Sequence, residues 1–167
     1  MRTFTPGIET ERNKGSNEPV NVLRLEWPEV TGNPALSIHF SDQQLTIGTI
    51  VCIPIVARWA EIDNLLVDSQ GAGTSVGDSQ IELLNFGVNF GSGVEQFADL
   101  VTRYPLESAR ATLYQWFGDA GLTESDLTPI LVATCEPIGW DEKIYTFDMV
   151  LISASYGEEK IGRVITT

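Results

Sequence analysis

Three strand patterns follow one another in the segment Leu106–Ser155: SARATLYQWF at Ser108–Phe117, PILVATCEP at Pro129–Pro137 and IYTFDMVLIS at Ile144–Ser153. In each, β-branched or aromatic residues alternate with other side chains, as in a strand with two unlike faces. Short polar turns join the patterns, so this half of the chain predicts a β-meander. No cluster of reactive side chains interrupts it, which favours a protein built to be assembled over one that catalyses.

Strand patterns also fill much of the first half of the chain. They lie at Val20–Trp27, Leu36–Phe40, Ile47–Ile62 and Ser79–Asn85. Pro54 has no amide hydrogen, so Ile47–Ile62 predicts one or two strands that lie at a sheet edge or contain a bulge. Helical spacing of apolar residues occurs at Val94–Thr102, before Tyr104-Pro105 ends it. Because strands and helices do not alternate, we predict a mainly β fold: an antiparallel β-barrel or sandwich with one flanking helix.

The length of 167 residues suits one domain. Residues 1–19 are polar and predict an N-terminal arm, which leaves residues 20–167 as a single β-rich domain. The segment Val67–Asp78 (VDSQGAGTSVGD) is rich in Gly, Ser and Asp and predicts a loop at a sheet edge. Arm and loop are the segments that we expect to contact partners.

The charge balance narrows the classes of partner. Lys and Arg number 10 against 23 Asp and Glu, a net charge of −13. Nucleic-acid binding requires a cationic surface, and so does binding to an anionic membrane, so we expect neither. The surplus of negative charge is explained by solubility, or by an acidic wall that repels DNA passing along it.

The remaining sequence features concern compartment and thiols. Met1–Asn21 lacks the apolar core of a signal peptide, and no apolar run approaches the about 20 residues of a spanning helix, so we expect synthesis in the cytoplasm. Cys52 and Cys135 lie on separate strand patterns. Buried free thiols are the favoured interpretation, and a disulfide stays open because its geometry cannot be tested from sequence.

The sequence gives only weak signals for catalytic, metal-binding or phosphate-binding groups of residues. The single histidine, His39, alternates with apolar neighbours and predicts a surface position on a strand rather than a metal ligand or a catalytic base. The glycine-rich Gly87–Gly93 lacks the Lys of a phosphate-binding loop. Carboxylates near one hairpin are interpreted as surface charge rather than a glycosidase pair: Glu136, Asp141, Glu142 and Asp148. We therefore predict no enzyme activity, cofactor or metal.

Aromatic residues supply the candidate contacts. The four tryptophans are Trp27, Trp59, Trp116 and Trp140. They fit positions in the core and at its rim, with a sugar-stacking platform as the alternative. Trp116, Tyr114 on the same strand face, and Trp140 at a turn are predicted interface anchors. The loop residues Ser69, Gln70 and Gly71 complete the predicted interface.

Four stretches of the chain carry a resemblance to a known family. They are Glu18–Leu23 (EPVNVL), Ala111–Phe117 (ATLYQWF), Leu131–Trp140 (LVATCEPIGW) and Tyr145–Leu151 (YTFDMVL). The chain resembles small tail-tip proteins of tailed bacteriophages, in the minor tail or baseplate hub group, over most of its length. The matching features are patterns of a fold rather than chemical motifs.

The resemblance implies a tail-tube-like β-barrel flanked by a helix. It further implies a homo-oligomeric ring that joins the tail tube to distal components, other phage tail proteins as partners, and no catalytic residues. The protein is then expected in the virion tail, after assembly in the host cytoplasm. Some hub relatives carry a cysteine-ligated iron–sulfur cluster, which two distant cysteines do not supply here.

Two other function classes stay open. A carbohydrate- or receptor-binding β-sandwich would use exposed Trp and Tyr side chains over a polar sheet face. A hydrolase would use the acidic residues near Trp140, namely Glu136, Asp141 and Asp148.

Overall fold

The computed structural model describes residues 20–30, 32–60, 80–91, 93–116, 125 and 127–151. The predicted arm (residues 1–19) lies outside the described residues, and so does the predicted loop at 67–78 with Ser69, Gln70 and Gly71. The described part is mainly β with a single α-helix, which confirms the fold class predicted from sequence.

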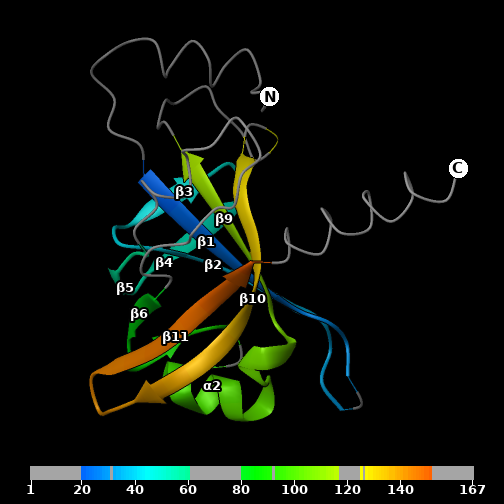
Figure 1. Cartoon of the computed structure of the whole chain (residues 1–167), viewed down its shortest axis with the longest axis vertical. Helices are drawn as coiled ribbons and strands as arrows, with labels where there is room; N and C mark the ends of the chain where they lie inside the picture. The colour runs from blue at the N-terminus through cyan, green and yellow to red at the C-terminus, as the bar shows by residue number, and fades with distance from the viewer. Residues whose placement is uncertain are drawn as a thin grey trace, which may run out of the picture.

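One large sheet dominates the fold (Figure 1). Its strands are β1 (Val20–Trp27), β2 (Leu36–Ser41), β3 (Leu45–Ile47), β4 (Ile50–Pro54), β5 (Val56–Arg58), β6 (Gln80–Leu84), β9 (Arg110–Trp116), β10 (Thr128–Trp140) and β11 (Ile144–Leu151). The nine strands are hydrogen-bonded in the order β3-β4-β2-β1-β9-β10-β11-β6-β5. The predicted C-terminal meander is therefore β9, β10 and β11, which are adjacent in the sheet as they are in the chain.

The sheet must curl because of how β4 and β5 are connected. A single residue, Ile55, separates them, yet β4 is second in the sheet order and β5 is last. Neighbouring strands lie about 4.8 Å apart and one residue spans at most about 3.5 Å, so a flat sheet could not make this connection. The Ile55 carbonyl also accepts a hydrogen bond from the Leu84 amide of β6 (2.7 Å).

Two details of the predicted fold differ from the structure. No described pair of strands closes the sheet with hydrogen bonds, so the barrel-or-sandwich detail is not confirmed. The sheet is also mixed rather than purely antiparallel, because β2 and β4 run parallel. The short hairpin of β3 and β4, with Gly48 at a positive φ of 59° in its turn, reverses the chain before β4 and so aligns β4 with β2.

The main core lies on the inner, concave side of the curled sheet. In β1, Leu23, Leu25 and Trp27 point into this core, as their alternation predicts, while Val22 and Arg24 point to the outer face. A second apolar cluster covers part of the outer face. It contains Val22, Ile47, Cys52, Tyr114 and Trp116.

Helix α2 (Phe97–Arg103) lies at one end of the curled sheet (Figure 1). It begins later than predicted, because Val94 and Glu95 form strand β8 and pair with β7 (Val88–Asn89) in a small hairpin. Phe97 and Leu100 are fully buried in the main core. A 3-10 helix, η2 (Leu106–Ser108), connects the end of α2 to β9.

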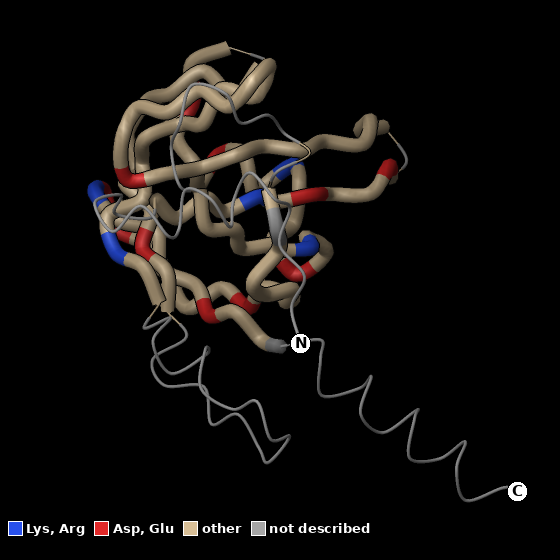
Figure 2. Tube along the Cα trace, turned by 90° about the horizontal axis from the view of Figure 1, so that it is seen from above, with Lys and Arg blue, Asp and Glu red and all other residues tan. Residues whose placement is uncertain are grey.

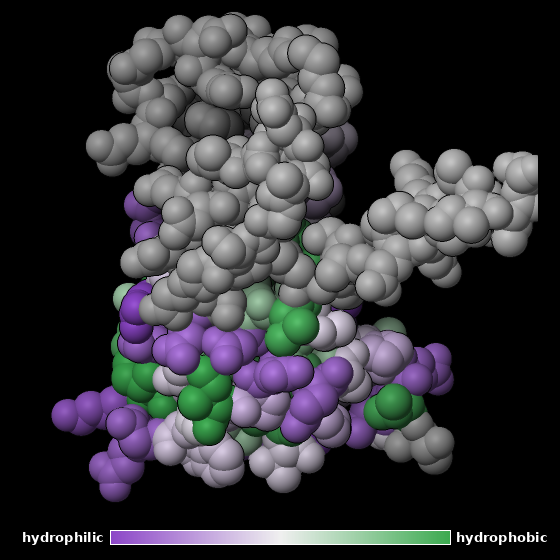
Figure 3. Space-filling model, viewed as in Figure 1, coloured by the Kyte–Doolittle hydropathy of each residue, from purple (hydrophilic) through white to green (hydrophobic). Residues whose placement is uncertain are grey.

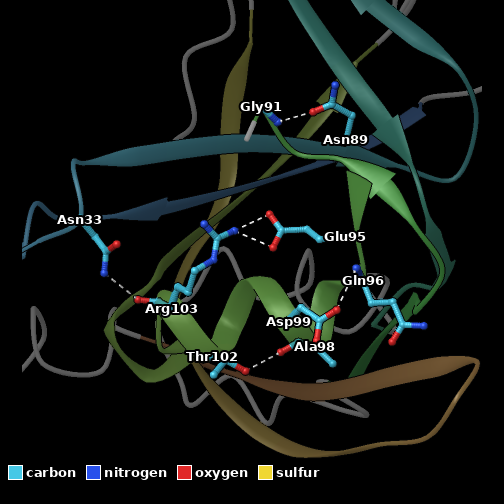
Figure 4. A network of polar contacts seen from close by, with 9 residues as sticks. All are labelled: Asn33, Asn89, Gly91, Glu95, Gln96, Ala98, Asp99, Thr102 and Arg103. Atoms are coloured by element: carbon cyan, nitrogen blue, oxygen red, sulfur yellow. Dashed lines mark hydrogen bonds and ion pairs between the residues drawn. The ribbon is translucent and has the colours of Figure 1, made fainter. Parts of the chain in front are cut away.

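Polar contacts attach α2 to its surroundings (Figure 4). Arg103 forms an ion pair with both carboxylate oxygens of Glu95 in β8, one of them at 2.6 Å. The Arg103 carbonyl accepts a hydrogen bond from Asn33 Nδ2 in the β1–β2 connection (3.1 Å). The Asp99 carboxylate accepts one from the Gln96 amide at the start of the helix (3.4 Å). These contacts thus hold the helix to the β1–β2 connection and to the β7–β8 hairpin.

The two cysteines provide a test of this arrangement. Both are free and buried, Cys52 in the outer cluster and Cys135 in the main core. Burial raises the pKa of Cys52 from 9.0 to about 11 and that of Cys135 from 9.0 to about 12. We expect a thiol-reactive reagent at pH 8 to modify neither cysteine of the native protein and both after unfolding in urea.

The same pKa shifts predict the direction of a pH effect. Above a pH of about 9 the unfolded chain loses thiol protons that the folded chain keeps, so stability should decline as pH rises from there. Replacing both cysteines with Ala should remove this part of the pH dependence. Rapid thiol modification in the native protein would contradict the burial of both residues.

Candidate functional site

A groove lies between α2, η2 and the β10–β11 hairpin, with a volume of about 340 Å³. Its lining is mostly apolar and comes from all of these elements: Ala98, Val101, Thr102, Pro105, Leu106, Glu107, Pro137, Trp140 and Tyr145. We call it the Trp140 groove, because Trp140 is its most exposed aromatic residue, with 66% of its surface accessible. Trp140 is a predicted interface anchor, and in the structure its side chain lines this groove.

One face of the Trp140 ring packs against an aromatic residue of the main core. Trp140 lies opposite Tyr145 in the β10–β11 pairing, and their rings stack with centroids 5.9 Å apart and planes 9° from parallel. Tyr145 is buried and meets Phe97 of α2 edge-on at 5.1 Å. One face of the indole therefore rests on a fixed ring while the other faces solvent. A partner that covers this face meets a rigid aromatic surface that loses little side-chain entropy on binding.

One buried amide holds the two walls of the groove together. Asn85 follows β6 and is only 2% exposed. Its Nδ2 donates a hydrogen bond to the Asp141 carbonyl in the β10–β11 turn (3.0 Å), and its Oδ1 accepts one from the Ala98 amide in the first turn of α2 (3.0 Å). The backbone N–H of Asn85 donates a hydrogen bond to the Lys143 carbonyl (2.7 Å). The position of the turn relative to the helix depends on this side chain.

The carboxylates near the hairpin have structural positions. The Asp141 carboxylate accepts hydrogen bonds from the amides of Lys143 and Ile144, both 2.7 Å long, and these bonds lower its pKa. Glu136 and Asp148 are paired in register across β10 and β11, and neither lines the groove. Among the described residues, Glu107 is the only carboxylate that lines the groove, so the acids considered for a hydrolase do not converge on Trp140.

The other predicted anchors lie elsewhere in the fold. Tyr114 and Trp116 are 5% and 3% exposed and belong to the outer cluster with Val22 and Ile47. The Tyr114 ring lies under the Arg24 guanidinium at 5.4 Å, and burial raises the pKa of its hydroxyl. The structure brings these two aromatic residues together, but neither offers the exposed surface that Trp140 does. Their role in an interface stays a prediction.

Trp27 and Trp59 complete the set of tryptophans. Trp27 is buried in the main core, where its indole N–H donates to the Pro105 carbonyl (3.1 Å). Trp59 is half-buried, and its N–H donates to the Asp42 carboxylate (3.0 Å). Both fit the positions in the core and at its rim that the composition favours.

The distribution of charge is diffuse in the described part of the molecule. Figure 2 shows Asp and Glu spread over strands and loops rather than gathered on one side. Among the described residues, no three His, Cys, Asp or Glu side chains are grouped closely enough to hold a metal ion. His39 is half-buried on β2. No described helix is both long and apolar enough to cross a bilayer.

Comparison with known proteins adds no relative to this picture. No family model, no curated protein and no solved structure matches the chain.

The roles given to Asn85 and Trp140 predict different costs of removal. Asn85→Ala leaves the Asp141 carbonyl and the Ala98 amide without their partner and should lower the free energy of unfolding by about 3 kcal/mol. Trp140→Ala removes an exposed ring from a stacked pair and should lower it by about 1 kcal/mol. Urea denaturation followed by circular dichroism measures both. Equal costs for the two variants would show that Trp140 serves the fold rather than a surface.

Proposed function

We propose that this protein is a structural subunit of the tail tip or baseplate hub of a tailed bacteriophage, where copies join into a ring between the tail tube and distal components. The observation that carries the proposal is the exposed Trp140 held rigidly beside an apolar groove. The strand patterns that resemble the tail-tip group, including the one that ends at Trp140, support the same assignment.

The surface around α2 has the composition of a contact surface. Exposed apolar side chains occur on the segments that meet there: Phe86 (50% exposed), Val94 (76%), Ile138 (52%) and Trp140 (66%). Asn85 ties the segment before Phe86 to the turn after Trp140. Figure 3 shows apolar patches among hydrophilic side chains over the half of the molecule that carries α2. An exposed tryptophan beside an apolar groove is a frequent hot spot of binding energy.

The ends of the sheet are a second feature that favours assembly. The first and last strands of the order, β3 and β5, have three residues each. Among the described strands, each has a partner on one side only. Short edges resist uncontrolled pairing, and closure into a ring covers edges that would otherwise favour aggregation.

The charge of the chain fits a subunit that surrounds DNA. A net charge of −13 opposes adhesion to the phosphate backbone, so an acidic lumen lets DNA pass. The same charge makes copies repel one another. Contact between subunits then depends on apolar surfaces such as the Trp140 groove, which contains one carboxylate.

Self-association of the purified protein tests this proposal. We expect the mass measured by light scattering to rise with protein concentration to a fixed multiple of the chain mass, and electron microscopy to show closed rings. Trp140→Ala should weaken association by at least about tenfold, equal to about 1.4 kcal/mol. Val150→Ala, which truncates another exposed apolar residue outside the groove, is the matched control and should associate like the natural protein. A strict monomer at every concentration, found in no virion, ends the proposal.

Carbohydrate binding is a second candidate, favoured by the parallel stack of Trp140 on Tyr145. A pyranose ring could lie on the free indole face while the Glu107 carboxylate accepts a hydrogen bond from a hydroxyl. Titration of the tryptophan fluorescence with a panel of glycans tests this candidate. Calorimetry compares the variants, because neither retains the Trp140 indole. Saturable binding heat that persists in Trp140→Phe and vanishes in Trp140→Ala supports this candidate. Identical changes in Trp140→Ala and the natural protein exclude the groove as a sugar site.

A further inference from the structure

Strands β2 and β4 form an incomplete pair. They run parallel, but only Phe40 with Ile53 and Ser41 with Pro54 are in register as partners. The earlier residues of both strands diverge, so the two strands open into a wedge. On the side away from β1, no described strand pairs with Leu36, Ser37 or Ile38.

Two hollows occupy this wedge and share His39 and Ile50 in their walls. One has a volume of about 330 Å³ and is lined by Ser37, Ile38, His39, Ile50, Val51, Ile53, Asn89 and Phe90. The other has a volume of about 430 Å³ and is lined by Arg24, His39, Ile50, Tyr114, Ser125 and Leu127. The two hollows adjoin at these shared residues, and we call them together the β2–β4 furrow.

The first hollow has apolar walls on rigid supports. Val51 of β4 is 68% exposed at its edge. Phe90 meets Phe40 edge-on at 6.3 Å and Phe97 at 6.2 Å, so the core fixes its position. An apolar side chain that entered between Val51 and Phe90 would contact both without moving either.

The second hollow has a cationic end. Arg24 lies opposite His39 in the β1–β2 pairing, and its guanidinium is held over the Tyr114 ring. One guanidinium nitrogen is 2.9 Å from the Glu26 carboxylate, and the buried Nε has no hydrogen-bond partner. Glu26 is itself opposite Arg110 of β9, so two arginines surround one carboxylate. Around Glu26, two guanidinium groups therefore lie near one carboxylate, on a chain of net charge −13.

We propose that the β2–β4 furrow binds an extended segment of a partner protein, which adds to the free edge of β2 as a strand. The backbone of the segment pairs with Leu36–Ile38, an apolar side chain enters between Val51 and Phe90, and an Asp or Glu carboxylate reaches Arg24. Strand addition of this kind draws affinity from main-chain hydrogen bonds and specificity from pockets for alternate side chains. Charge complementarity selects the acidic residue, because arginine pairs with carboxylates in a forked geometry.

The inference goes beyond the tail-tip proposal and does not rest on it. The furrow and the Trp140 groove have no lining residue in common. A failure at one surface therefore leaves the test of the other intact.

Selection from a displayed library of random peptides of about eight residues, against the full chain, tests the inference. The expected consensus has apolar residues at every second position and an Asp or Glu near one end. A synthetic peptide with this consensus should bind saturably in fluorescence anisotropy. Val51→Lys, a change at an exposed residue, should weaken binding at least about tenfold. Val150→Ala, a change at an exposed residue that lines neither the furrow nor the Trp140 groove, is the control and should bind the peptide unchanged.

A double-mutant cycle identifies the partner of the carboxylate. Changing the acidic residue of the peptide to its amide should weaken binding to the natural chain about tenfold and should have no effect on Arg24→Gln. Arg24→Lys should recover part of the loss, and urea denaturation checks that each variant folds. Equal effects of the amide on both chains would overturn the inference. So would a library without enriched peptides, a consensus without the two-residue period, or citrate or phosphate that binds at Arg24 while no peptide does.

Discussion

The connection at Ile55 is the constraint on which the rest of this fold depends. It joins strands that stand near opposite ends of a nine-stranded order, so the sheet has to curl until β4 and β5 are one residue apart, although no described strand pair closes it. Curling places Leu23, Leu25 and their counterparts on other strands around one core. The open end of the curl is covered by α2, whose Phe97 and Leu100 complete the core. The two candidate surfaces follow from this geometry.

The β2–β4 furrow is a consequence of the same connection. The segment Ile50–Arg58 pairs with β2 through its first strand, β4, and with β6 through its second strand, β5. It therefore stays beside β2 for only two residue pairs. The divergence of the strands leaves one side of β2 open. At the α2 end, β6 finishes at Leu84, which places Asn85 where it can bond to both the helix and the β10–β11 turn. That bond positions the walls of the Trp140 groove.

The local sequence patterns were sufficient to predict individual strands and the helix. They were not sufficient to predict which distant residues are in contact. The alternation in Val20–Trp27 predicted β1 with its correct bounds and buried face. In β9, four consecutive residues from Ala111 to Tyr114 are buried, because one apolar cluster covers each face of the strand. The alternation of residues therefore could not show that Tyr114 and Trp116, on the outer face, are buried. Asn85 gave no signal either, since its side chain bonds to residues 13 and 56 positions away. The parallel pairing of β2 with β4 likewise depends on where Ile55 leads the chain.

The chemistry of the two surfaces bears on how copies of this acidic chain would associate in the proposed ring. A closed ring built from head-to-tail contacts needs two different surfaces on each subunit, because each surface meets an unlike one. The Trp140 groove is apolar and rigid, whereas the furrow combines a strand edge with a cationic end. Repulsion between chains of charge −13 disfavours most relative orientations of two copies. At these two surfaces the repulsion is weaker, for a different reason at each. Glu107 is the one carboxylate among the described residues that line the first surface, and the second is the surface proposed to bind a carboxylate. A subunit with this division can favour a directed contact over random association without any change in its fold.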